Sequence, residues 1–151
     1  MPVYTSKDLQ QRSGATHMQI SRWTELGIIL PEEDAKGRGR VRRFNQQNLI
    51  EAMICKQLTE YFRLDTSIML EIVSWLRDNA FFPPGRADRQ TYYEYTMAIA
   101  PEEPIFLTVF PGGDKLNGIL GPAKELRAFL KKHRVSITIN VTRIIEDAGG
   151  L

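Results

Sequence analysis

The chain has 151 residues, 20 of them basic and 18 acidic, so its formal net charge is only +2, and 42% of its residues are hydrophobic. This composition excludes wholesale disorder and suits one compact domain or two small ones with a buried core. The single cysteine excludes an internal disulfide and a multi-cysteine metal site, and no apolar run is long enough to cross a membrane. We therefore expect a cytoplasmic protein with no cofactor and no membrane partner.

Two short helices joined by a turn are predicted at the start of the chain. Thr5 can cap the first helix, and Gly14 is a typical helix stop. Thr16 then caps a second helix over residues 17–26, which Gly27 ends. Short helices on either side of a turn that contains glycine indicate a helix-turn-helix.

A basic segment, "KGRGRVRRFN", follows and predicts a β-hairpin. Arg38, Arg40 and Arg42 recur at every second residue, so on an extended strand their side chains would share one face. We expect residues 28–30 and 40–44 to form the two arms. A solvated charged loop stays open as the alternative, because runs of like charge are often disordered.

Two longer helices complete this half of the chain. Asn45 can cap a helix over residues 46–63, and Asp65 or Thr66 a further helix that ends near Asp78. The last helix has an unusually broad apolar surface, part of which should meet another element or a second subunit. The residues assigned to a dimer interface are Ile68, Ile72, Trp75 and Leu76.

The pattern changes after this helix. Residues 80–90 contain two prolines and a glycine without periodicity, which predicts a linker. Residues 91–100 and 104–110 are β-branched and aromatic, which predicts two strands. Residues 122–134 predict a helix, and the strict alternation over 135–145 predicts another strand.

The predicted fold class is therefore α+β. A mainly helical winged helix-turn-helix occupies residues 1–79, and a linker covers residues 80–90. A small strand–strand–helix–strand module follows over residues 91–151. We expect this module to serve in dimerisation or to bind a small-molecule effector.

Residues 4–78 resemble the DNA-binding domain of the MerR family of bacterial transcription regulators. The matching elements occur in family order: Tyr4-Thr5 at the first helix, "GATHMQISRW" through the turn and second helix, "ELGII" before Pro31, and "VRRFNQQNL". The resemblance implies that the arginine-glycine run is the wing that grips the DNA backbone. It also implies a sequence-specific transcription regulator of double-stranded DNA, with RNA polymerase as a further candidate partner.

Two departures from the family pattern stand out. The usual Arg-Tyr-Tyr of the second helix is Ser21-Arg22-Trp23 here, which moves the arginine by about 100° around the helix. The long helix that forms a coiled coil between subunits in this family has no counterpart after Asp78. We therefore expect a homodimer assembled through residues 65–151, because specific DNA sites generally match a two-fold protein.

The candidate DNA contacts fall into two groups. On the second helix, Arg22 could bind guanine and Gln19 adenine through paired hydrogen bonds, while the wing arginines could bind phosphates. For Arg22 an ion pair with Glu25 stays open, and for Trp23 core packing does. The full set is Thr5, Thr16, His17, Gln19, Ser21, Arg22, Trp23, Arg38, Arg40, Arg42 and Arg43.

Other functions have less support in the sequence. His17 and His133 lie in different halves without a ligand or triad pattern, so we expect no enzyme. One alternative is an architectural or excisionase-like protein that bends DNA. Another is a ligand-binding or interaction module whose helix-turn-helix has become structural.

Overall fold

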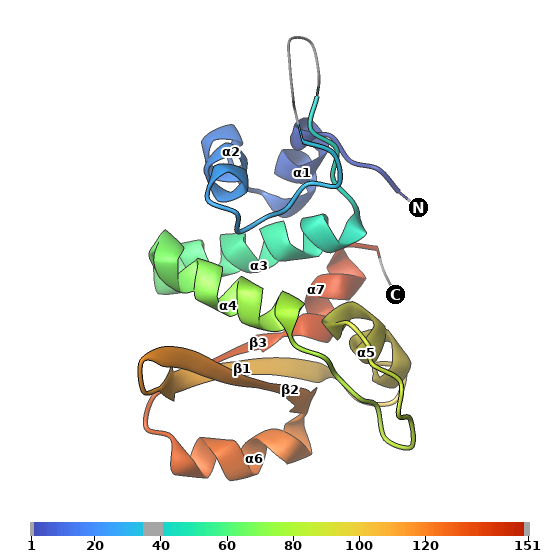
Figure 1. Ribbon diagram of the computed structural model, residues 1–151, viewed down its shortest axis with the longest axis vertical. Helices are drawn as coiled ribbons and strands as arrows, with labels where there is room; N and C mark the ends of the chain where they lie inside the picture. The colour runs from blue at the N-terminus through green and yellow to red at the C-terminus, as the bar shows by residue number, and fades with distance from the viewer. Residues whose placement is uncertain (1, 35–40, 150–151) are drawn as a thin grey trace. The chain divides into compact units, whose positions relative to one another are not determined.

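The computed structural model describes residues 2–34 and 41–149, and its fold is α+β, as the sequence predicted (Figure 1). These residues contain seven helices and one three-stranded antiparallel sheet. They divide into two compact units, Met1–Val73 and Ser74–Gly149. In the described ranges, every helix is too short or too polar to cross a membrane.

The first unit is helical. It contains α1 (Ser6–Ser13), α2 (His17–Glu25), α3 (Gln46–Phe62) and the beginning of α4 (Thr66–Asp78). Each of the first three helices starts with a capping box, in which the cap and the third helical residue satisfy each other's backbone N–H groups. Because these signals are local in sequence, the helix starts were predictable.

The first arm of the predicted hairpin lies later in the chain than expected. Ile28 and Ile29 are fully buried, and both of their backbone N–H groups donate to the carbonyl of Trp23. They therefore end α2 and fill the core instead of pairing with the basic arm. The backbone pair that closes the hairpin joins Glu33 to Arg43, with N···O distances of 3.2 and 2.9 Å.

The second unit is built on a sheet with strand order β2-β1-β3. Its elements after α4 are α5 (Tyr92–Ile99), β1 (Ile105–Gly112), β2 (Lys115–Pro122), α6 (Ala123–Lys132), β3 (Ile137–Asn140) and α7 (Val141–Asp147). The long β1–β2 hairpin pairs Ile105 with Pro122 at one end and Gly112 with Lys115 at the other. α6 lies against one face of the sheet, and α5 and α7 lie on the other side (Figure 1).

The segment over residues 91–100 is a helix, α5, and the predicted strand is wrong. The Thr91 hydroxyl accepts a hydrogen bond from the backbone N–H of Glu94, which starts the helix. Tyr92, Tyr95 and Thr96 are its buried residues. The second and third lie three and four residues after the first, which is the spacing of one helix face. The buried side chains therefore match a helix, although aromatic and β-branched residues favour strands.

The long strand predicted over residues 135–145 is also wrong in extent. Only Ile137–Asn140 forms β3, and the Asn140 side chain then caps α7 by accepting from the N–H of Arg143 at 2.9 Å. Beyond this cap Val141 and Ile144 are buried at helical spacing. The alternating pattern over residues 135–145 therefore gave no sign that Asn140, in the middle of this segment, caps a helix.

Strand β2 was not predicted from the sequence, and two glycines, one in the turn before it and one inside it, are of particular interest. Gly113, with φ of 82°, forms the turn of the hairpin. Gly118 lies inside the strand, where a Cβ atom would meet the Trp75 ring and the Thr108 carbonyl oxygen at 3.2 Å. The close approach of the indole ring and of the Thr108 backbone therefore leaves little room for a side chain at this position.

Residues 80–90, predicted as a linker, are fastened at both ends within the second unit. Phe81 and Gln90 pair through two backbone hydrogen bonds of 2.9 and 3.0 Å. The Phe81 ring also packs against Trp75 and Tyr95, with centroid distances of 5.9 and 5.7 Å. The segment is therefore a closed loop packed on its own unit.

Candidate nucleic-acid interface

The turn between α1 and α2 is fixed by short-range contacts. Gly14 adopts the left-handed conformation with φ of 78°, and its N–H donates to the carbonyl of Gln10 at 3.0 Å. The N–H of Ala15 donates to the Ser13 hydroxyl at 3.2 Å, and the Ala15 side chain is buried. A residue with a side chain would be strained at Gly14, so this turn fixes where α2 begins.

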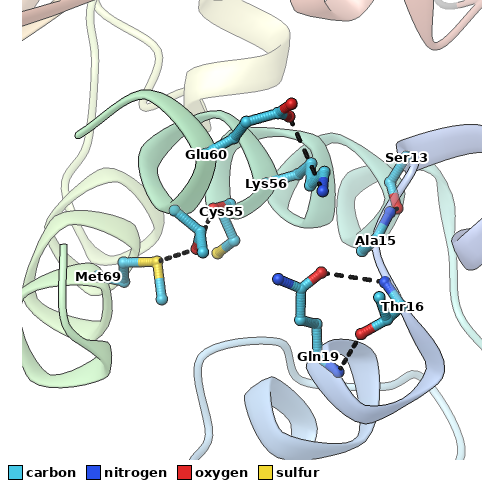
Figure 2. A network of polar contacts seen from close by, with 9 residues as sticks. Ser13, Ala15, Thr16, Gln19, Cys55, Lys56, Glu60 and Met69 are labelled. Atoms are coloured by element: carbon cyan, nitrogen blue, oxygen red, sulfur yellow. Dashed lines mark hydrogen bonds and ion pairs between the residues drawn. The ribbon is translucent and has the colours of Figure 1, made fainter. Parts of the chain in front are cut away.

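The first turn of α2 is held by a reciprocal cap (Figure 2). The backbone N–H of Thr16 donates to Oε1 of Gln19 at 3.0 Å, and the N–H of Gln19 donates to the Thr16 hydroxyl at 3.1 Å. Paired recognition of adenine needs both the amide oxygen and the amide nitrogen. The oxygen has a second lone pair and the amide nitrogen takes no part in this cap, so Gln19 helps to position α2 while its contact with adenine stays a prediction.

The buried side of α2 is formed by Ile20, Trp23 and Thr24. Trp23 is only 2% exposed, so its placement among the DNA contacts is corrected: the indole belongs to the core. Leu26, which follows the last residue of α2, is 43% exposed.

The exposed side of α2 carries most of the other expected contacts. His17 and Arg22 are exposed, and Nδ1 of His17 lies 3.3 Å from Nε2 of Gln10. Ser21 is half-buried, and its hydroxyl lies 3.5 Å from the Glu25 carboxylate. In the part of the chain that the structure describes, Arg22 forms no ion pair with Glu25, so the guanidinium is free for a partner.

Met18 was not among the predicted contacts. This side chain is 80% exposed although it is apolar, and it lies in the first turn of α2. The residues at the N-terminal end of a recognition helix are those that reach base edges. Only its position beside His17 pointed to a contact, because a methionine at this spacing more often packs in a core.

A groove of about 690 Å³ lies along the exposed side of α2, within the first unit. Its walls come from α2 and from the corner between α3 and α4. Its lining residues include His17, Met18, Ser21, Arg22, Thr59, Leu64, Asp65 and Met69. The first unit therefore leaves the exposed face of α2 open to a ligand.

The wing hairpin, whose described arms are residues 33–34 and 41–44, carries its own counter-charges. Nε of Arg42 lies 3.0 Å from the Asp34 carboxylate, and Nε of Arg43 lies 3.6 Å from the Glu33 carboxylate. Both pairs are partly exposed, so each contributes at most about 1 kcal/mol to stability. Arg38 and Arg40 lie outside the described residues.

The second arm of the wing hairpin is joined to the rest of the unit through Tyr4. The backbones of Tyr4 and Phe44 exchange two hydrogen bonds of 2.7 and 2.8 Å. The Tyr4 hydroxyl donates to Oε1 of Gln46 at 2.6 Å and accepts from Nη1 of Arg12 at 3.1 Å. The Arg12 guanidinium also lies over the Tyr4 ring, 5.3 Å from its centroid. Arg12, which the sequence analysis did not single out, thus connects α1 to the base of the hairpin.

Thr5 acts as a cap. Its hydroxyl accepts from the N–H of Asp8 at 3.2 Å, and its own N–H donates to the Asp8 carboxylate at 2.8 Å. The hydrogen bonds from the backbone and side chain of Thr5 lower the pKa of Asp8. The hydroxyl of Thr5 is therefore already engaged in starting α1.

The tentative dimer interface is largely part of this chain's own core. Ile72 and Leu76 have no exposed surface, and Trp75 packs against Gly118 and the Phe81 ring. Ile68 is half-exposed. The assignment of these side chains to a subunit interface is corrected accordingly.

The second unit contains a smaller cavity, of about 320 Å³. It is lined by Pro83, Pro84, Arg86, Tyr95, Ala98, Ile99, Glu102, Glu103, Pro122, Lys124 and Glu125. Burial raises the pKa of the Tyr95 hydroxyl, and the nearby Glu125 carboxylate raises it further.

Comparison of the chain with known protein families and with curated proteins found no match.

Proposed function

We propose that the chain is a cytoplasmic, sequence-specific double-stranded-DNA-binding transcription regulator of the MerR type. The observation that carries the proposal is the exposed face of α2. It begins at a firmly capped turn, it takes no part in the core, and it carries the guanidinium of Arg22, which forms no ion pair within residues 2–34 and 41–149. A helix with this presentation suits the major groove, where arginine binds guanine through two hydrogen bonds.

The wing hairpin supports the same proposal. Its described arginines, Arg42 and Arg43, lie on the arm that Tyr4 joins to the helical core. Hairpins that flank a recognition helix hold DNA through phosphates and add affinity without sequence information. The hairpin therefore suits a role in affinity, and α2 a role in specificity.

Selection of bound sequences from a random pool of duplex DNA tests the proposal. The wild-type chain should enrich one sequence family, and an inverted repeat within it would support a homodimer. Arg22→Ala should weaken binding to the selected site by about 1–3 kcal/mol and relax preference at one base position.

Lys7→Ala is the matched control for Arg22→Ala. Lys7 is an exposed cation on α1, so its loss removes the same charge from the same unit without touching the α2 face. This variant should bind all sequences slightly less well and keep the same preference. Enrichment of no sequence by the wild type, or an unchanged preference in Arg22→Ala, would overturn the proposal.

Light scattering tests the expected homodimer. The chain has a mass of 17.3 kDa, so a dimer should scatter as a particle of twice that mass. A monomer that still selects an inverted repeat would show that two chains meet only on DNA.

A further inference from the structure

A second group of cations lies on the second unit, along α6 and just beyond its C-terminal end. Residues 124–134 contain five basic residues and one acidic residue, a local charge of +4 in a chain whose net charge is +2. Lys124 pairs with Glu103 at 3.2 Å. The other four, Arg127, Lys131, Lys132 and Arg134, are exposed, and none forms an ion pair in the described ranges; we call them the α6 basic surface.

The apolar side of α6 holds these cations in place. Leu126 is buried, and the Phe129 ring packs against Phe110 with a centroid distance of 5.8 Å. The His133 ring stacks on the same Phe110 at 3.9 Å, which fixes the chain where the helix ends. Lys132 and Arg134 flank this stacked histidine and are therefore held at the surface.

Helix geometry brings the cations of α6 together. At about 100° per residue, Lys124, Arg127 and Lys131 fall within about 60° of one another around the axis and span about 10 Å along it. The helix dipole favours cations in the last turn, which accounts for Lys131 and Lys132. It does not account for Arg127, which lies in the middle of the helix, nor for Arg134 beyond its end.

The kind of partner follows from what surrounds the cations. A membrane surface is a poor fit, because basic amphipathic helices bind it by inserting their apolar face, and here Leu126 and Phe129 face the sheet. A protein partner is also a poor fit, because protein interfaces are depleted in lysine at their centre. Nucleic-acid interfaces are much more positively charged, and unpaired lysines and arginines are what phosphates bind.

We propose that the α6 basic surface binds the phosphate backbone of double-stranded DNA, as a second contact besides the one proposed for α2 and the wing hairpin. The choice of DNA as the polyanion rests on the proposed function. The contact is independent of sequence, because phosphates carry no base identity.

The test uses the full chain and a short duplex of random sequence, with binding followed by fluorescence anisotropy at several salt concentrations. Arg127→Ala with Lys131→Ala removes two phosphate contacts and should flatten the slope of log K against log salt by about 1.8. Between about 50 and 200 mM salt, wild-type affinity should then fall about tenfold further than that of the variant. Arg127→Glu with Lys131→Glu should weaken binding more than the alanine pair.

Arg89→Ala with Lys115→Ala is the matched control. Both residues are exposed cations of the second unit outside α6, so the net charge changes by the same amount. This control should keep a steeper slope than the α6 variant. Equal slopes in the α6 variant, the control and the wild type would overturn the proposal, provided circular dichroism shows that all three are folded.

The outcome is separable from that of the proposed function. If the wild type selects a DNA sequence but the α6 variant has the same salt slope as the wild type, only this inference is overturned. A flattened slope in a chain that selects no sequence sinks the α2 proposal alone. Loss of binding to a polyglutamate probe, with DNA binding unchanged, would reassign the surface to an acidic protein and overturn the inference.

Discussion

The wing hairpin and the α6 basic surface are the two places where basic residues crowd together in this chain, and they differ in how their charge is balanced. Residues 36–43 contain five cations, and so do residues 124–134. At the wing, Arg42 and Arg43 face the carboxylates of Asp34 and Glu33. At α6, four cations have no such partner in the described part of the chain.

The difference shows that the density of basic residues along a sequence does not give the charge that a partner meets. A hairpin returns the chain on itself, so acidic residues a few positions earlier lie opposite the arginines. A helix that packs its apolar side on a sheet leaves its charged side facing water. The backbone therefore decides which cations are available.

The largest effect should come from breaking the unit that carries the wing hairpin. Trp23 is fully enclosed in that unit, so Trp23→Ala should lower its free energy of unfolding by about 3–5 kcal/mol. Sequence-specific binding should be lost, while salt-dependent binding through the α6 basic surface persists. Urea unfolding followed by circular dichroism measures the first effect and anisotropy the second.

Tyr61→Ala serves as the control for that experiment, because Tyr61 is a large aromatic residue on α3 that is mostly exposed. Its loss should change stability by no more than about 0.5 kcal/mol. If Trp23→Ala is as stable as this control, the indole has no structural role and its burial has been misjudged.

Removing an acidic partner of a wing arginine would make the wing hairpin more like the α6 basic surface, whose cations have no acidic partner in the described residues. Asp34→Asn removes the carboxylate 3.0 Å from Arg42, which should strengthen binding to all DNA sequences by about 1 kcal/mol and steepen the salt slope. Glu60→Gln, which releases Lys56 on α3, changes the net charge equally. Equal gains in both variants would show that net charge alone is responsible.

Met18 allows a sharper test of the sequence-specific contact proposed for α2. An exposed methionine at the start of a recognition helix can contact the C5 methyl group of thymine. Met18→Ala should cost about 0.8 kcal/mol on the selected site. Replacing thymine with deoxyuridine, which lacks this methyl group, should cost the wild type a similar amount and the variant nothing.

Leu26→Ala is the control for the methyl contact, since Leu26 is an exposed apolar residue at the other end of α2. It should respond to deoxyuridine as the wild type does. If the losses of binding free energy from Met18→Ala and from deoxyuridine are additive at every thymine of the site, the Met18 side chain and the thymine methyl group do not touch.

The smallest expected effect concerns an acidic residue that caps a helix. The hydrogen bonds from Thr5 place the pKa of Asp8 below its ordinary value of 3.8 in the folded chain. Asp8 therefore stabilises the fold above that ordinary value, and this contribution is lost as the pH falls through the lowered pKa. The difference in unfolding free energy between wild type and Asp8→Asn should be constant above about pH 5 and shrink below it.

Asp8→Asn also changes the net charge as Asp34→Asn does, which makes it a second reference for the wing. Asp8 caps α1 and faces no wing arginine in the described residues, so its loss should leave the salt slope unchanged. A steeper slope in both variants would contradict the role given to Asp34.

The first half of the fold was predictable because its signals are local. The three capping boxes and Gly14 lie within four residues of the helix ends that they define, so the helix-turn-helix could be predicted from short motifs. The N-terminal arm of the hairpin could not, because burial of Ile28 and Ile29 depends on a core assembled from distant segments.

The second half was harder for the same reason. In α5 the aromatic residues predicted a strand, and only packing against Phe81 and its neighbours favours the helical period. Strand β2 was not predicted, and it contains a glycine with little room for a side chain because Trp75 approaches it. At the candidate site, neither the burial of Trp23 nor the exposure of Met18 can be read from residue type alone. The DNA contacts of Arg22, Gln19 and the wing stay predictions.

The cap between Thr16 and Gln19 has a consequence for how binding specificity could evolve. Because these two residues set the start of α2, the exposed positions 18 and 22 can be exchanged without shifting the frame of the helix. Under the proposed function, new DNA sites would then be reached by single substitutions at those two positions. A change at Gln19 would instead disturb the cap and shift the start of α2. Related chains that recognise different DNA sites should therefore retain Thr16 and Gln19 and differ at positions 18 and 22.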